Sequence, residues 1–112
     1  MNFDKSLISG STMLLVLHML ETGDMYGYEM IKELEQRSDN TFTLKEGTLY
    51  PILHSLEKEG SVVSYMAKGD TGRKRKYYQL TKNGRKLLAS KKEEWSLFSK
   101  TVNKVIGGSR YA

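Results

Sequence analysis

The chain has 112 residues and a formal net charge of +5, and this length is sufficient for one small hydrophobic core. It contains no cysteine, which excludes disulfides and thiolate metal sites. No apolar run approaches the roughly 20 residues of a membrane-spanning helix, and the first ten residues lack the layout of a signal peptide. We therefore expect a cytoplasmic protein.

The charged residues are unevenly distributed along the chain. Residues 1–67 contain five lysines and arginines against ten acidic residues, whereas residues 68–92 contain ten lysines and arginines against Asp70 alone. A basic block of this kind favours a polyanionic partner, with nucleic acid ahead of a membrane surface. It is equally compatible with a well-solvated face of the protein.

The sequence lacks the residue groupings that catalysis requires. Its two histidines, His18 and His54, fall in separate helical segments without a carboxylate at ligand spacing. There is no glycine-rich phosphate loop, no GxSxG motif and no cluster of metal ligands. We therefore expect neither an enzyme nor a bound metal or cofactor.

The first predicted helix begins at a cap on Asp4, runs to about Glu21 and ends at Gly23-Asp24. Its apolar residues form two stripes at helical spacing. One stripe is Met13, Val16, Leu17 and Leu20, and the other is Leu7, Ser11, Leu14 and His18. Because a small domain offers one core, the second stripe is expected to meet a partner chain, unless the helix is enclosed within its own domain.

Two shorter helices are predicted next. The first covers Tyr26–Arg37, and its inward face is Met30, Ile31 and Leu34. The second is predicted to open at Thr43, because Thr43-Leu44-Lys45-Glu46 matches the T-x-x-E capping box, and to end at Glu59-Gly60.

Segments 61–68 and 75–81 are rich in valine and tyrosine with partial alternation, which is typical of β-strands. The loop Gly69-Asp70-Thr71-Gly72 lies between them. They predict a β-hairpin with a basic tip and a basic second strand.

A last helix is predicted over residues 82–106, capped by Thr81 and followed by Gly107-Gly108. It carries a heptad-like apolar stripe that is interrupted only by Lys91. If this helix stood alone, Trp95 and Phe98 on the stripe would be exposed to water. Burial in a two-fold dimer is the simplest solution. We expect the interface to contain Leu88, Trp95, Phe98, Val102 and Val105.

This order of elements predicts a mainly α-helical fold with a small β-hairpin, a winged helix-turn-helix plus a long C-terminal dimerisation helix. The winged helix-turn-helix would cover residues 1–81 and the dimerisation helix residues 82–106, with a flexible tail over 107–112. The last helix would pack with the first as one structural unit. In such a fold the third helix enters the major groove of DNA, and the hairpin forms the wing.

The third helix contains a glycine and the only proline of the chain, an unusual pair for a helix interior. Pro51 would clash with the carbonyl of residue 47, and glycine at that position lets the backbone bend with less penalty. Tyr50 offers a hydroxyl for a phosphate and a ring for a sugar or a thymine methyl. The segment is thus shaped for close approach to DNA, unless Pro51 is only a kink and Tyr50 fills the core.

Two motifs, GTLYPILHSLEKEG (Gly47–Gly60) and GRKRKYYQLTKNG (Gly72–Gly84), together resemble the PadR family of bacterial transcriptional regulators. YGYEMIKEL (Tyr26–Leu34) is similar to the start of that family's second helix. The resemblance covers nearly the whole chain and indicates the short PadR-like subgroup with a single C-terminal helix. Lys74 replaces the usual proline of the wing motif, which adds charge and loosens the wing.

The resemblance implies a homodimeric repressor that binds double-stranded DNA at a palindromic operator and is released by a small effector. The residues expected to contact DNA are Lys45, Thr48, Tyr50, Pro51, His54, Arg73, Lys74, Arg75 and Lys76. Lys45 is included for its place in the first turn of the helix, and His54 is equally compatible with a solvated helix residue. Of Tyr77 and Tyr78, one should pack inward and the other should stay near the DNA.

In drug-sensing members of that family, an aromatic residue in the region of Trp95 helps to line a pocket between subunits. A tryptophan pair across a two-fold axis can hold a flat aromatic ligand by offset stacking. The residues expected at such an effector site are Leu7, Ser11, Leu14, His18, Leu88, Trp95 and Ser99. The alternative is that Trp95 only anchors the dimer interface.

A rival interpretation is a winged-helix protein-interaction module whose basic wing binds an acidic partner. An RNA-binding module is disfavoured, because binding to single strands would require exposed paired aromatic side chains on a sheet, which we do not expect.

Overall fold

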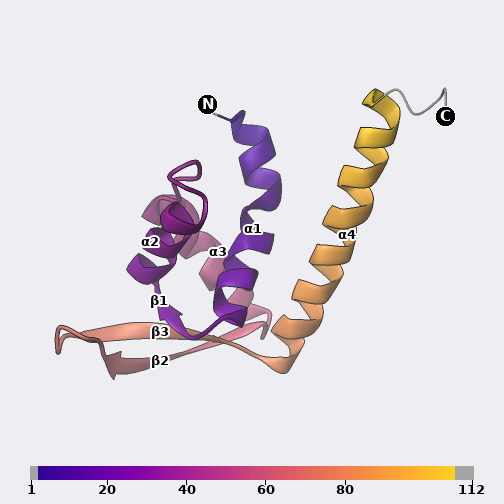
Figure 1. Ribbon diagram of the computed structural model, residues 1–112. Coiled ribbons are helices and arrows are strands. Elements are labelled where there is room, and N and C mark those ends of the chain that lie inside the picture. Colours follow the sequence, from indigo (N-terminus) through magenta and orange to yellow (C-terminus); the bar gives the residue numbers. More distant parts are fainter. Residues whose placement is uncertain (1–2, 108–112) are drawn as a thin grey trace.

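A computed structural model of the protein describes residues 3–107 (Figure 1). The elements follow in the order α1 (Lys5–Glu21), β1 (Met25–Tyr26), α2 (Gly27–Arg37), α3 (Glu46–Lys58), β2 (Val62–Lys68), β3 (Lys74–Leu80) and α4 (Lys82–Ile106). The strands form an antiparallel sheet in the order β1-β3-β2. The first three helices stand over one face of this sheet, and α4 rises from its end beside α1 (Figure 1). This arrangement confirms the predicted winged helix-turn-helix with a long C-terminal helix.

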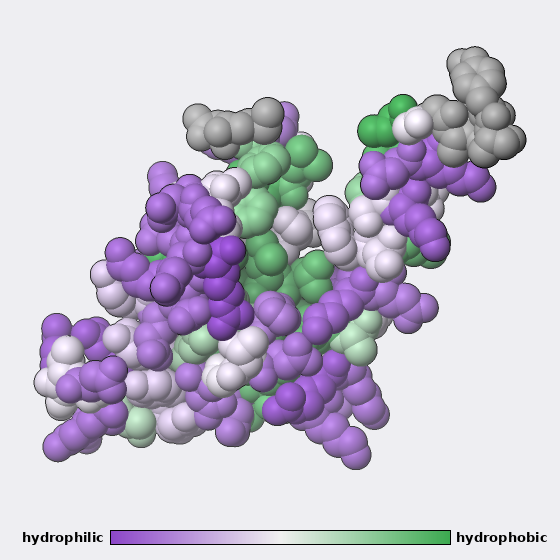
Figure 2. All heavy atoms as spheres, viewed as in Figure 1, coloured by the Kyte–Doolittle hydropathy of each residue, from purple (hydrophilic) through white to green (hydrophobic). Residues whose placement is uncertain are grey.

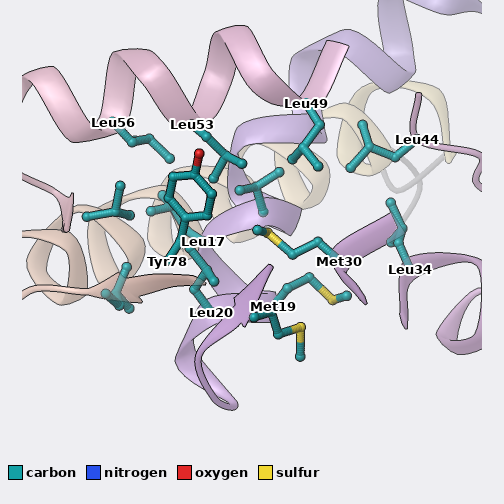
Figure 3. Close-up of a cluster of buried hydrophobic side chains, with 14 of the residues drawn as sticks. Leu17, Met19, Leu20, Met30, Leu34, Leu44, Leu49, Leu53, Leu56 and Tyr78 are labelled. Carbon is teal, nitrogen blue, oxygen red and sulfur yellow. The ribbon is translucent and has the colours of Figure 1, made fainter. Parts of the chain in front are cut away.

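The hydrophobic core lies where α1, α2 and α3 meet above the sheet. Figure 3 shows Leu49, Leu53 and Leu56 of α3 directed towards side chains of α1 and α2. The three leucines are fully buried, as are Leu17 of α1 and Met30 of α2. Full burial of each such side chain contributes roughly 1.5–3 kcal/mol. These contacts fix one face of α3 against the core and leave its other face to solvent.

The start of α3 differs from the prediction. The helix begins at Glu46, and its N-cap is Lys45 in an extended conformation without a side-chain cap. The capping box predicted at Thr43 is therefore wrong. Leu44 is only 7% exposed, and we attribute the extended backbone before α3 to burial of this side chain in the core. Burial of a leucine outweighs a cap, which contributes about 1 kcal/mol.

Strand β1 was not predicted from the sequence, because it has only two residues. Met25 pairs with Tyr78 and Tyr26 pairs with Tyr77, so the turn between α1 and α2 is joined to β3. Asp24, just before β1, accepts hydrogen bonds from the Tyr65 hydroxyl at 2.6 Å and from Nε2 of Gln79 at 3.2 Å. The wing is thereby attached to the helical part of the domain.

The predicted hairpin is present as β2 and β3, paired in register from Val62 opposite Leu80 to Lys68 opposite Lys74. Its tip is closed by a hydrogen bond of 3.0 Å from the Gly69 amide to the Arg73 carbonyl. Gly72 has a φ of +82°, a conformation that glycine adopts without strain.

Helix α4 has the predicted bounds and the predicted cap. The Thr81 hydroxyl accepts a hydrogen bond of 3.0 Å from the Gly84 amide and donates one of 2.7 Å to the Gly60 carbonyl. Gly84 and Leu88 are buried, whereas residues further along the helix are largely exposed. Of the predicted tail, residues 108–112 lie outside the described part of the chain. No helix among residues 3–107 is long and apolar enough to cross a membrane.

Candidate nucleic-acid interface

The outward face of α3 presents the residues that the sequence assigned to DNA contact. Leu49, Leu53 and Leu56 face the core and Ile52 packs against it, so the opposite side of the helix faces solvent. Thr48, Pro51 and His54 are exposed, as is Lys45 at the cap. Tyr50 is 44% exposed and therefore does not fill the core. An exposed face of this kind on the third helix can enter a major groove.

The second half of the predicted set lies on the wing, where β3 carries three successive cations. Lys74 and Lys76 are exposed, and Arg75 between them is partly buried. Nζ of Lys76 lies 3.8 Å from Oε1 of Glu57 and 5.5 Å from the centre of the Tyr78 ring. Arg73, just before the strand, is exposed at the hairpin tip.

Arg75 is held by an aromatic ring. The centre of its guanidinium lies 5.0 Å from the centre of the Tyr26 ring, which is within the range of a cation–π interaction. Among the described residues, its Nε is the one buried side-chain nitrogen or oxygen without a hydrogen-bond partner. A buried N–H donor without an acceptor costs roughly 1–3 kcal/mol.

A hollow of about 430 Å³ separates the start of α2, the start of α3 and the wing. It brings Tyr50, Lys74, Arg75 and Lys76 together, whereas the other predicted contact residues do not line it. Tyr26, Gly27, Tyr28, Glu46 and Tyr78 complete the lining. Of these, Tyr26, Gly27, Tyr28 and Glu46 were not predicted as site residues. The sequence signal for the first three is a glycine between two tyrosines at the start of a helix.

The ring of Tyr50 lies directly over Gly27. A Cβ atom at position 27 would lie 2.8 Å from Cζ of Tyr50, closer than two carbon atoms can approach without repulsion. Glycine at this position therefore permits the ring to lie across the start of α2. Burial, followed by the negative charge of Glu46, raises the pKa of the Tyr50 hydroxyl. The hydroxyl is protonated at neutral pH and can donate a hydrogen bond.

One of the two wing tyrosines, Tyr77 and Tyr78, was predicted to pack inward. Tyr78 does so, with 4% of its surface exposed. Tyr77 projects to the other side of the sheet and stacks on Tyr65, with ring centres 5.7 Å apart. Tyr65 is 40% exposed, so the expectation that the sheet has no exposed paired aromatics is wrong. Tyr77 contacts both Tyr65 and Tyr26, which leaves little free ring face for a base.

A second hollow, of about 390 Å³, lies between α1 and the middle of α4. Figure 2 shows hydrophobic residues along the furrow between these helices. Of the predicted effector residues, Leu7, Leu14 and Trp95 line it. Phe98, which was predicted for the dimer interface, also lines it, with Ser6, Gly10, Lys91 and Glu94.

The other predicted effector residues lie elsewhere. Leu88 is 1% exposed in the core of its own chain, so its assignment to the effector site and the dimer interface is corrected. The stripe of α4 turns towards the core at its first turns and away from it further along. Ser11 and Ser99 donate hydrogen bonds to carbonyls of their own helices at 3.1 Å and 3.2 Å. Nδ1 of His18 lies 3.4 Å from the carboxylate of Glu21.

The fold and this interface define a class of protein. A winged helix-turn-helix with an exposed third-helix face beside a basic wing is the architecture of a DNA-binding transcriptional regulator. Within residues 3–107 no group of three potential ligands is arranged to hold a metal.

Comparison with known proteins gives the family. The model of the PadR-like family of transcriptional regulators matches residues 16–90, and the chain belongs to this family. Its members are transcriptional regulators and not enzymes, which agrees with the prediction from the sequence.

Two relatives and two solved structures illustrate the match. The chain is 32% identical to Uncharacterized protein X of Lysinibacillus sphaericus, covering 91% of this chain and 94% of that protein. It is 32% identical to Transcriptional regulator Rv3488 of Mycobacterium tuberculosis, covering 86% and 83%. The structure of a transcriptional regulator from Clostridium thermocellum superposes with a TM-score of 0.83 at 37% identity, covering 91% and 99%. A PadR-like regulator from Bacillus cereus gives 0.81 at 28% identity, covering 94% and 100%.

Proposed function

We propose that this PadR-family regulator acts as a homodimeric repressor that binds a palindromic operator and is released by a small aromatic or drug-like effector. The observation that carries the proposal is the common hollow on which the exposed side of α3 and the cations of the wing converge. In this proposal Thr48, Tyr50, Pro51 and His54 face bases and nearby sugars, and Lys45 with the wing cations neutralises phosphates.

The proposed dimer is supported by the exposed apolar stripe on the outer half of α4. Trp95, Phe98, Val102 and Val105 are 50%, 59%, 37% and 77% exposed in the single chain. A contiguous apolar surface of this kind is typical of a protein interface. A two-fold dimer would place two α3 helices about 34–36 Å apart, one turn of the DNA helix.

The proposed effector site is supported by the hollow between α1 and α4. It presents Trp95 and Phe98 beside Leu7 and Leu14, which together form an apolar wall suited to a planar ligand. An effector that binds one spacing of the recognition helices better than another would shift DNA affinity by about 1–3 kcal/mol, as is typical for allosteric coupling.

The test is a fluorescence-anisotropy titration with the promoter duplex upstream of the protein's own gene and with a scrambled duplex, at two salt concentrations. We expect tighter binding to the promoter, weakening steeply with salt because phosphate contacts release counterions. Equal, salt-dependent binding to both duplexes would contradict recognition of this promoter. Absence of binding to both, with binding to an acidic polypeptide, would favour a protein-interaction module instead.

A further inference from the structure

The outer half of the wing extends beyond the three-stranded part of the sheet. Strand β1 pairs with β3 only at Tyr77 and Tyr78, so residues 66–76 form a two-stranded outer arm, which projects past the helices in Figure 1. The four wing cations expected to contact DNA, at positions 73–76, lie on this outer arm. Because a two-stranded hairpin is only marginally stable and twists easily, the direction of the outer arm depends on how its base is held.

Two hydrogen bonds from adjacent residues of β2 hold this base. The Tyr65 hydroxyl donates to the Asp24 carboxylate at 2.6 Å, and the Ser64 hydroxyl donates to the Glu57 carboxylate at 2.6 Å. Both donors lie opposite the residues of β3 that pair with β1. Since adjacent side chains of a strand point to opposite faces of the sheet, the two carboxylates hold the wing from its two faces.

We propose that Asp24 and Glu57 are positioning residues for DNA binding, which together set the angle between the outer arm and the recognition helix α3. The proposal rests on the proposed DNA-binding function and adds to it the residues that direct the wing. Arg73 lies about 13 Å along the strand from Tyr77, so a rotation of about 10° at the base would move the tip by about 2 Å. A hydrogen bond tolerates a change of only about 0.5 Å, so the cations would lose their contacts with DNA.

Asp24 can serve as a fixed point because its turn is bonded to two helices. Glu21 at the end of α1 accepts a hydrogen bond of 3.0 Å from Lys92 of α4. The Thr22 hydroxyl accepts one of 3.0 Å from the guanidinium of Arg37, at the end of α2. The turn is therefore held by α2 and α4, and its hydrogen bond with the wing joins the wing to both helices.

Glu57 holds the wing to the recognition helix itself. It belongs to α3 and directly follows Leu56, which is fully buried and fixes this end of the helix in the core. One carboxylate oxygen accepts the hydrogen bond from Ser64 of β2, and the other lies 3.8 Å from Nζ of Lys76 of β3. Glu57 thus contacts both strands of the wing, on the face opposite to Asp24.

The Tyr65 hydroxyl is directed towards Asp24 because its ring is fixed by stacking. The Tyr65 and Tyr77 rings are nearly parallel, at 14°, with centres 5.7 Å apart, and Tyr77 packs edge-on against Tyr26. The hydrogen bond to Asp24 raises the pKa of the Tyr65 hydroxyl, which therefore stays protonated and donates at neutral pH. Tyr65→Phe removes this hydrogen bond, keeps the ring stack and leaves the net charge unchanged.

The primary test measures how much Arg73 at the wing tip contributes to promoter binding with and without the two hydrogen bonds. In the parent, Arg73→Ala should weaken binding about tenfold, the loss expected for charge-assisted contacts in both half-sites. Tyr65→Phe and Ser64→Ala should each weaken binding about threefold, and the double variant about tenfold. In the double variant, Arg73→Ala should then weaken binding by less than about twofold, because the wing no longer reaches its DNA contacts.

Hydroxyl-radical footprinting of the same complexes separates a misdirected wing from a damaged fold. In the double variant, protection of the DNA flank under the wing should be lost, whereas protection of the major-groove site under α3 should remain. Thermal unfolding and the dimer dissociation constant should stay close to those of the parent. A variant that acted only by loosening the domain would lose both protections together, and this result would overturn the proposal.

Tyr77→Phe is the matched control, since it makes the same change on the neighbouring ring. Within residues 3–107 the Tyr77 hydroxyl forms no hydrogen bond, so this variant should match the parent in affinity, footprint and dependence on Arg73. If the double variant kept the affinity, the footprint and the full Arg73 dependence of the parent, the positioning role would be disproved while the proposed function would stand. If the parent bound no duplex at all, both proposals would fail.

The direction of the wing can also be measured without DNA. The chain has no cysteine, so Asp70→Cys at the wing tip accepts a single spin label. In the parent and in Tyr77→Phe, the label should broaden amide NMR signals in a sharply position-dependent pattern. In the double variant the broadening should spread over more residues and weaken at each, because the tip samples a larger volume. An unchanged pattern in the double variant would overturn the proposal.

Discussion

The ammonium of Lys92 donates a hydrogen bond of 3.0 Å to the carboxylate of Glu21, which joins the middle of α4 to the end of α1. The two residues are 71 positions apart in the sequence. Beyond this point α4 leaves its own core, and Trp95, one turn further along, is half exposed. The ion pair therefore marks the place where α4 stops packing within its own chain.

This ion pair predicts a small, pH-dependent contribution to stability. The hydrogen bond from Lys92 is the main reason why the pKa of the Glu21 carboxyl is lowered. The folded state thus binds this proton less readily than the unfolded state. The contribution is present above the ordinary pKa of glutamate, about 4.3, and is lost as the pH falls through the lower, folded-state value.

The measurement is thermal unfolding of the parent and of Glu21→Gln between about pH 7 and pH 3. We expect Glu21→Gln to be slightly less stable at pH 7 and to converge on the parent in acid. Glu93→Gln on α4 is the control, because among the described residues Glu93 forms no ion pair. A constant difference between Glu21→Gln and the parent at every pH would show that the ion pair has no linked proton.

A second prediction concerns two glycines with opposite surroundings. A Cβ atom at Gly84 would meet the Ser61 carbonyl oxygen and would lie 2.6 Å from Cδ1 of Leu80, at the junction of β3 and α4. Gly84→Ala should therefore destabilise the fold by about 1–3 kcal/mol, the usual cost of overpacking. A Cβ atom at Gly10 in α1 would have nothing within 4 Å, so Gly10→Ala should stabilise by about 0.5–1 kcal/mol through helix propensity. Urea unfolding of both variants measures this difference, and equal effects would contradict it.

Most of the fold could be predicted because its signals are local. Helix α4 has the predicted bounds, since the Thr81 cap and a continuous helical segment define it. The start of α3 could not be placed from its local signal, because burial of Leu44 overrides the capping motif at Thr43. Strand β1 escaped prediction because two residues are too few for a pattern, and tertiary pairing alone reveals it.

Part of the candidate site could likewise be predicted from the sequence, and part could not. Exposure of Tyr50 and Pro51 follows from helical periodicity, because Leu49 and Leu53 on either side of them must face the core. The contact of Tyr50 with Gly27 depends on how α2 crosses α3, which one sequence does not specify. Leu88 was misassigned because heptad spacing shows which residues share a stripe, and not which turn of the helix leaves the core.

The variant Tyr50→Ala tests whether α3 contacts DNA through its outward face. The substitution removes an exposed ring and a hydroxyl from the outward face without touching the core, so the fold and the oligomeric state should be unchanged. Affinity for the operator should fall by about tenfold or more, as expected when a contact worth roughly 1–3 kcal/mol is lost. Val63→Ala truncates another exposed apolar residue, on β2, and should bind like the parent. If Tyr50→Ala bound the operator like the parent, α3 would not read DNA through this residue.

Trp95→Ala tests the outer half of α4. Trp95 and Leu97 are both exposed, at 50% and 66%, but only Trp95 lies on the apolar stripe and lines the hollow against α1. If Trp95 anchors the interface, Trp95→Ala should raise the dissociation constant of the dimer by about tenfold or more. Leu97→Ala should leave this constant nearly unchanged. Sedimentation equilibrium at several concentrations measures both dissociation constants.

The same pair of variants separates the two roles of Trp95. If Trp95→Ala remains dimeric and binds the operator, but planar aromatic compounds no longer release it, then Trp95 stacks on the ligand. If the dimer weakens and operator affinity falls in proportion, Trp95 is an anchor of the interface. Truncation of a tryptophan that is buried in a dimer interface or against a ligand must cost binding energy. If the parent, Trp95→Ala and Leu97→Ala had equal dimer dissociation constants and the same response to ligands, Trp95 would therefore serve neither as an interface anchor nor as a ligand contact.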